Sequence, residues 1–158
     1  MNIHEYLYQC RNNEQQRIHN LRVERTSLKS TIDGENHNLV RNSHCDWAMK
    51  EAKERLAQST KRLAEVEKAI ASPWQMPAPK KCEELESLYR LMDQAERGRY
   101  IAESALTIAV NNERPRAEAQ VRQELAECER DAEKYRKQLR KGLEAVHVDP
   151  APFCGRAV

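Results

Sequence analysis

The chain has 158 residues, 33% of them charged and 5% aromatic, and its 27 basic and 25 acidic residues leave a formal net charge of +2. This balance excludes a strongly polycationic or polyanionic protein, and an apolar content of 39% favours narrow apolar seams between helices over a thick core. No stretch approaches the ~20 apolar residues that cross a bilayer, and five widely spaced cysteines suit reduced thiols, so we expect a cytoplasmic protein with no membrane span.

The first predicted helix covers residues 3–32. Asn2 and Glu5 can form a capping box at its start, and Gly34 can take the left-handed conformation that ends a helix. Apolar residues recur in steps of three, four or their sums, but Glu14 interrupts them, so this helix has the weakest seam. The apolar positions are Ile3, Leu7, Cys10, Ile18, Leu21, Leu28 and Ile32.

The second predicted helix has a clearer pattern, because its apolar residues fill consecutive a and d positions of a heptad. It starts either near Asn36 or at Ser43, where Ser43 and Asp46 can form a capping box, and Ser72-Pro73 ends it. The a and d residues are Met49, Ala52, Leu56, Ser59, Leu63, Val66 and Ile70.

A Pro-rich connector follows at residues 72–81, SPWQMPAPKK, where three prolines favour an extended path. Trp74 and Met76 allow two interpretations. They can fold back over the end of the helices as a lid, or they can anchor the chain in a pocket on a partner protein. Trp47 and Phe153 are weaker candidates for the same anchoring role.

The third predicted helix begins near Lys80 and continues the heptad. Its second half, residues 100–110, is the most apolar stretch of the chain, and there Ile101, Ala105 and Ile108 add a second stripe beside the first. A helix with two apolar stripes needs two neighbours, so we expect more than two helices to pack here, or an oligomer to form. The first stripe consists of Leu85, Leu88, Met92, Ala95, Ala102, Leu106 and Ala109.

The last predicted helix follows a turn or kink at residues 111–115, where Pro115 breaks the pattern, and it extends to residue 146. The residues beyond it, 147–158, are predicted to be a tail that is extended or disordered. The seam of this helix consists of Val121, Leu125, Cys128, Ala132, Tyr135, Leu139 and Val146.

We therefore predict an all-α fold of two long antiparallel helical hairpins of the coiled-coil kind, which can also close into one elongated four-helix bundle. The N-terminal hairpin covers residues 1–71 and the C-terminal hairpin covers residues 82–146. The connector at 72–81 joins them, and the tail at 147–158 completes the chain.

The patterns of common catalytic and cofactor sites are missing from the sequence. Its four glycines are too far apart for a phosphate-binding GxGxxG or P-loop. A di-iron bundle needs two Glu-x-x-His pairs, and only Glu144 with His147 is present. His37, His44 and Cys45 are poor candidates for a zinc site, because the side chains of His44 and Cys45 would point in different directions on a helix. We expect no cofactor, no metal and no enzymatic activity.

Two hypotheses for function remain. The first is a non-catalytic scaffold or adaptor that binds another protein, itself as a homo-oligomer, or both, and that can block a surface on a larger assembly. The second is association with nucleic acid through one basic stripe of the last helix, although acidic residues such as Glu133 interrupt that stripe. The partner-binding candidates are Trp74, Met76, Ile101, Ala105 and Ile108. The nucleic-acid candidates are Arg130, Lys134, Lys137 and Lys141.

Overall fold

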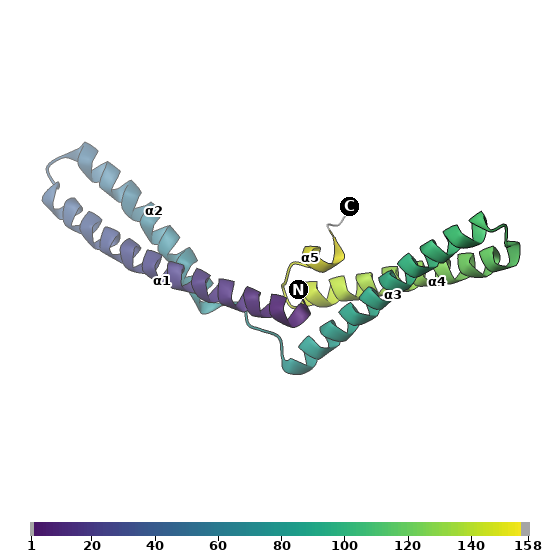
Figure 1. Ribbon diagram of the computed structural model, residues 1–158. Helices are drawn as coiled ribbons and strands as arrows, with labels where there is room; N and C mark the ends of the chain where they lie inside the picture. Colours follow the sequence, from purple (N-terminus) through teal and green to yellow (C-terminus); the bar gives the residue numbers. More distant parts are fainter. Residues whose placement is uncertain (1, 156–158) are drawn as a thin grey trace. The chain divides into compact units, whose positions relative to one another are not determined.

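The computed structural model describes residues 2–155, and the chain is all-α over that range, with no strand among those residues (Figure 1). The prediction of long helices paired as hairpins is confirmed. The helices are α1 (Ile3–Arg41), α2 (Asp46–Ala71), α3 (Pro79–Asn111), α4 (Pro115–Ala145) and the short α5 (Ala151–Cys154).

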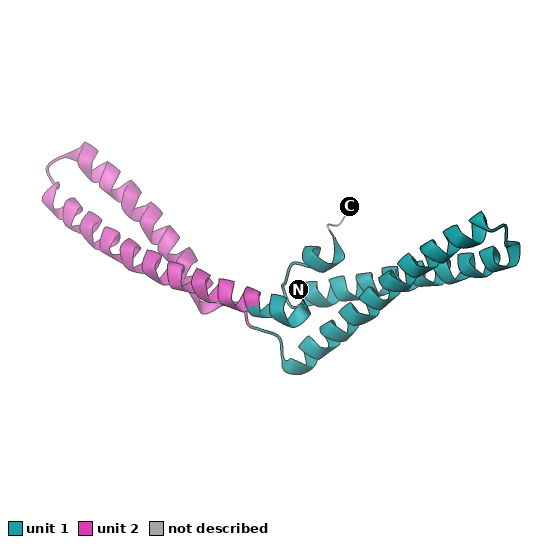
Figure 2. Ribbon diagram, viewed as in Figure 1, with its two compact units in different colours: residues 1–8, 76–158 teal, residues 9–75 magenta. Residues whose placement is uncertain are grey.

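The chain forms two compact units, which are coloured separately in Figure 2. One unit consists of residues 9–75, and the other consists of residues 1–8 together with 76–158. The predicted N-terminal hairpin covers residues 1–71, and the observed unit differs from it at both ends. Residues 72–75 belong to this unit, whereas the first turns of α1 belong with the C-terminal part of the chain. Ile3 and Leu7 are fully buried there.

Ion pairs between α1 and α2 join the two helices of the 9–75 unit. Arg62 binds Glu24 at 2.7 Å, and Arg55 binds Glu35 at 2.9 Å. Between residues 9 and 75, the buried apolar side chains are only Ala52 and Val66. With so few buried side chains, this hairpin has a thin core. Its partly exposed ion pairs add little, because each contributes at most about 1 kcal/mol.

The sequence predicts that the first helix ends at Gly34, but the helix continues to Arg41. A glycine inside a helix costs about 1 kcal/mol relative to alanine. Beyond Gly34, however, Glu35 pairs with Arg55 of α2, so the residues that follow still have a helical neighbour. The capping box at Ser43 does not form either, since α2 has Cys45 as its N-cap and no side-chain capping bond.

Glu14, which interrupts the apolar pattern of α1, contacts the connector. Its carboxylate accepts a hydrogen bond from the backbone N–H of Trp74 at 2.9 Å and pairs with Arg17 at 2.6 Å. The hydrogen bond from Arg17, more than the one from Trp74, holds the pKa of Glu14 below its usual value. The connector itself is non-helical over residues 72–78, and α3 begins at Pro79 within the predicted connector range.

Helices α3 and α4 run side by side as an antiparallel hairpin (Figure 1). Most of their buried side chains lie on the predicted seam positions, and Cys82 and Leu143 are the exceptions. At two points, a glycine on one helix leaves room for a side chain of the other. A Cβ atom placed on Gly142 would lie 2.6 Å from Leu85, and one on Gly98 would lie 3.0 Å from Cys128. The buried seam consists of Leu85, Met92, Ala102, Ala109, Ala132, Leu139 and Leu143.

The prediction of an extended tail is wrong for residues 151–154. Residues 151–154 form α5, and Phe153 packs edge-on against Tyr6 and Tyr89, with ring centroids 5.2 Å away in both cases. Arg140 of α4 also donates hydrogen bonds to the carbonyl oxygens of Cys154 and Gly155. Aromatic packing and these bonds order a segment that has too little apolar periodicity to reveal a helix in sequence. Residues 156–158 of the predicted tail lie outside the described residues.

The start of α1 is fixed as the sequence predicts. The Asn2 side chain accepts a hydrogen bond from the Glu5 N–H at 2.8 Å, and the Glu5 carboxylate accepts one from the Asn2 N–H at 3.0 Å. The N–H of Ile3 also donates to Glu86 of α3 at 3.2 Å. The capping box is therefore confirmed, and it is attached to α3.

Candidate protein-binding surface

Helix α3 carries a second row of apolar residues outside its seam with α4. Leu91 is 41% exposed, Ile101 is 67% exposed and Ile108 is 62% exposed. These side chains are ten and seven residues apart, so they lie within about a quarter-turn of one another around the helix. We call this row the α3 stripe; it consists of Leu91, Gly98, Ile101, Ala105 and Ile108.

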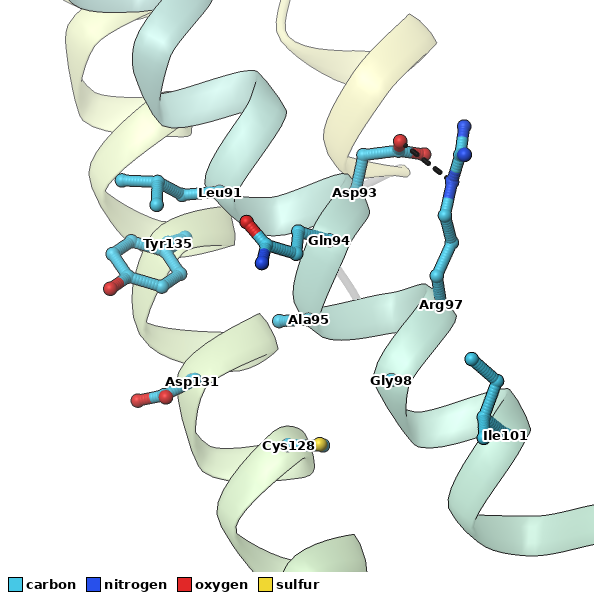
Figure 3. Close-up of a pocket in the computed structure, with 10 residues that line it drawn as sticks. All are labelled: Leu91, Asp93, Gln94, Ala95, Arg97, Gly98, Ile101, Cys128, Asp131 and Tyr135. Atoms are coloured by element: carbon cyan, nitrogen blue, oxygen red, sulfur yellow. Dashed lines mark ion pairs between the residues drawn. The ribbon is translucent and has the colours of Figure 1, made fainter.

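The α3 stripe borders a groove of about 660 Å³ between α3 and α4 (Figure 3). Gly98 lies in the middle of the groove, and Figure 3 shows the Cys128 side chain directed toward it. Because Gly98 has no side chain, α4 comes close enough for Cys128 to fill the space. The groove is lined by Leu91, Asp93, Gln94, Ala95, Arg97, Gly98, Ile101, Cys128, Asp131 and Tyr135.

The two edges of the groove differ in charge. On the α4 edge, Asp131 lines the groove. Glu127 and Glu124, four and seven residues before it, are also exposed, so the three carboxylates form one acidic row along α4. On the α3 edge, Arg97 is paired with Asp93 at 2.9 Å, and its side chain is 78% exposed. A guanidinium has five N–H donors, so this ion pair leaves Arg97 with capacity to bind a further carboxylate.

The structure gathers only part of the predicted partner-binding set. Ile101, Ala105 and Ile108 lie together on α3, with Ala105 half-buried because it is nearer to the seam. Trp74 and Met76 are both half-buried in the connector, Trp74 in the 9–75 unit and Met76 in the unit that contains α3. Of the weaker candidates, Trp47 is 74% exposed, whereas Phe153 packs within its own unit.

Sequence reasoning missed two parts of this surface. Gly98 lies three residues before Ile101, and Leu91 lies seven residues before Gly98, so extending the stripe at helical spacing would have found them. The acidic row of α4 has the same spacing. Its position beside the α3 stripe could not be predicted, because the rotation of one helix about the other depends on packing.

The predicted basic stripe of α4 is exposed, but neighbours engage several of its members. Lys137 pairs with Glu133 at 3.2 Å, and Lys134 lies over the Tyr135 ring, 5.2 Å from its centroid. Hydrogen bonding to Lys137 is the main reason that the pKa of Glu133 is lowered. Arg130 donates to the carbonyl oxygen of Ala126, and Lys141 is exposed. A carboxylate inside the stripe weakens its attraction for phosphates.

Within residues 2–155, no group of three or more His, Cys, Asp and Glu side chains lies close enough to hold a metal ion. Burial raises the pKa of the Cys82 and Cys154 thiols, which disfavours the reactive thiolate. None of the helices in the same part of the chain combines the length and apolar character needed to cross a bilayer.

Comparison with known proteins gives no relative: no protein family, no curated protein and no solved structure matches this chain. Its function must therefore be inferred from its own surfaces.

Proposed function

We propose that this chain is a non-catalytic helical scaffold or adaptor that binds another protein, a second copy of itself, or both, through the α3 stripe. Such a chain can also act by covering a surface on a larger assembly and blocking it. The proposal includes a cytoplasmic location, which rests on the wide spacing of its five cysteines.

One observation carries this proposal: the exposed large apolar side chains concentrate on α3. Leu91, Ile101 and Ile108 lie on its open side, beside a groove with an acidic edge. Apolar residues scattered singly over a surface need no explanation, but several exposed apolar side chains along one helix are typical of a helix-pairing interface.

The test is capture of partners from native lysate by the tagged chain, with and without nuclease, comparing wild type with Ile101→Asp. A charge at position 101 should remove most of the captured protein, because an unpaired carboxylate would be buried in the interface. Thr107→Asp is the matched control, since Thr107 is also exposed on α3 but lies away from the stripe. Circular dichroism of each variant verifies that the helices are intact.

Retention of every partner by Ile101→Asp contradicts the proposal. Trp74→Ala in the same assay separates the two interpretations of the connector, because loss of a partner without loss of helix content indicates an anchor and not a lid. Captured material that disappears with nuclease, with high salt and with charge reversal at Lys134, Lys137 and Lys141 would favour the nucleic-acid hypothesis instead.

A further inference from the structure

The α3 stripe and the seam with α4 point in different directions from the same helix. Successive residues of a helix turn by about 100°, and on that basis the stripe lies roughly a quarter-turn around α3 from the seam. A second helix can therefore pack on the stripe while α4 keeps its place, because each stripe takes its own neighbour. This neighbour would also cover the groove and contact both of its charged edges.

The acidic row of α4 lies at the same height along the hairpin as Arg97. The close approach of Gly98 and Cys128 sets this height. Since the helices are antiparallel, the residue before Gly98 lies level with the residue after Cys128, which is between Glu127 and Asp131. Within one chain, however, Arg97 and Asp131 lie on opposite sides of the groove, as Figure 3 shows.

A second copy brings the two charges together if the two α3 helices are parallel. A two-fold axis along the helices turns the Arg97 side of one copy toward the α4 side of the other. An antiparallel pair would instead place the two acidic rows beside each other and leave Arg97 on the opposite side. Opposite charges across an interface fix orientation, and like charges close together oppose association.

We propose, on the basis of the function proposed above, that two copies of this chain pair in parallel along the α3 stripe, with Arg97 of each copy binding Glu127 and Asp131 of the other. Each stripe residue then meets its own counterpart, so Ile101 packs on Ile101 and Ile108 on Ile108.

Sedimentation of the full chain tests the charge pairing. Wild type should dimerise, and Arg97→Glu should weaken the dimer about tenfold or more, as should Glu127→Arg with Asp131→Arg in one chain. An equal mixture of these two variants should form a heterodimer, because opposite charges face each other again in both halves of the interface. Lys61→Glu on α2 is the charge-matched control and should dimerise like wild type.

Cross-linking tests the orientation. Chains with Leu91→Cys and chains with Ile108→Cys are mixed and oxidised, and peptide mapping identifies the linked positions. A parallel pair links 91 to 91 and 108 to 108. Links between 91 and 108 would show an antiparallel pair and overturn the proposal. Thr107→Cys, away from the stripe, should add no dimer to the wild-type background.

The same variants separate failure of this inference from failure of the proposed function. If the wild-type chain is a monomer but Ile101→Asp still loses its lysate partner, the stripe binds a different protein and the second copy is overturned. If Ile101→Asp dimerises and captures partners like wild type, the stripe is not an interface, and both proposals fail.

Discussion

Gly34 and Gly142 both lie inside helices, but a methyl group added to each would meet different surroundings. Nothing lies within 4 Å of a Cβ placed on Gly34, whereas one on Gly142 would lie 2.6 Å from Leu85, which is fully buried. Gly34→Ala should therefore raise the free energy of unfolding by about 1 kcal/mol through helix propensity. Gly142→Ala should lower it by about 1–3 kcal/mol through overpacking. Urea unfolding of both variants measures the difference, and equal stability would contradict it.

Glu14 shows at the same scale why some residues mislead a sequence pattern. In the heptad of α1 it looks like a defect, because a carboxylate occupies a position near the apolar row. In the folded chain it accepts the N–H of Trp74, which comes from a segment 60 residues away in sequence. Such a residue can be recognised as an interruption from sequence, but its partner becomes visible only in the fold.

At the scale of elements, α5 has only four residues and no helical stability of its own, so contacts with other helices must hold it. Phe153→Ala removes two edge-to-face ring contacts and should lower the free energy of unfolding by about 2–3 kcal/mol. Trp47→Ala removes a larger ring that is 74% exposed, and its effect should stay within about 0.5 kcal/mol. Thermal unfolding compares the two variants, and a larger loss for Trp47→Ala would refute this account of α5.

At the scale of the whole molecule, the two units differ in how they are held together. Only Ala52 and Val66 are buried in the 9–75 unit, whereas the unit with α3 and α4 has a longer buried seam and the packed tail. Amide hydrogen exchange should therefore be faster in α2 than in the seam residues of α3 and α4, by at least about tenfold for a difference of 1.4 kcal/mol. Equal protection of the two hairpins would show that their stabilities do not follow apolar burial.

The sequence by itself determined the all-α class, the seam of α3 with α4, the capping box at Asn2 and Glu5, and the presence of a second apolar row at Ile101 and Ile108. These features depend on residues within one or two turns of each other, so their spacing in the sequence records them.

The tertiary structure alone decided the continuation of α1 beyond Gly34, the packing of Phe153 on Tyr6 and Tyr89, and the position of the acidic row of α4 beside the α3 stripe. The physical reason is common to all of them. Each depends on contacts between segments that are distant in the chain, and packing sets those contacts, whereas local propensity and spacing do not.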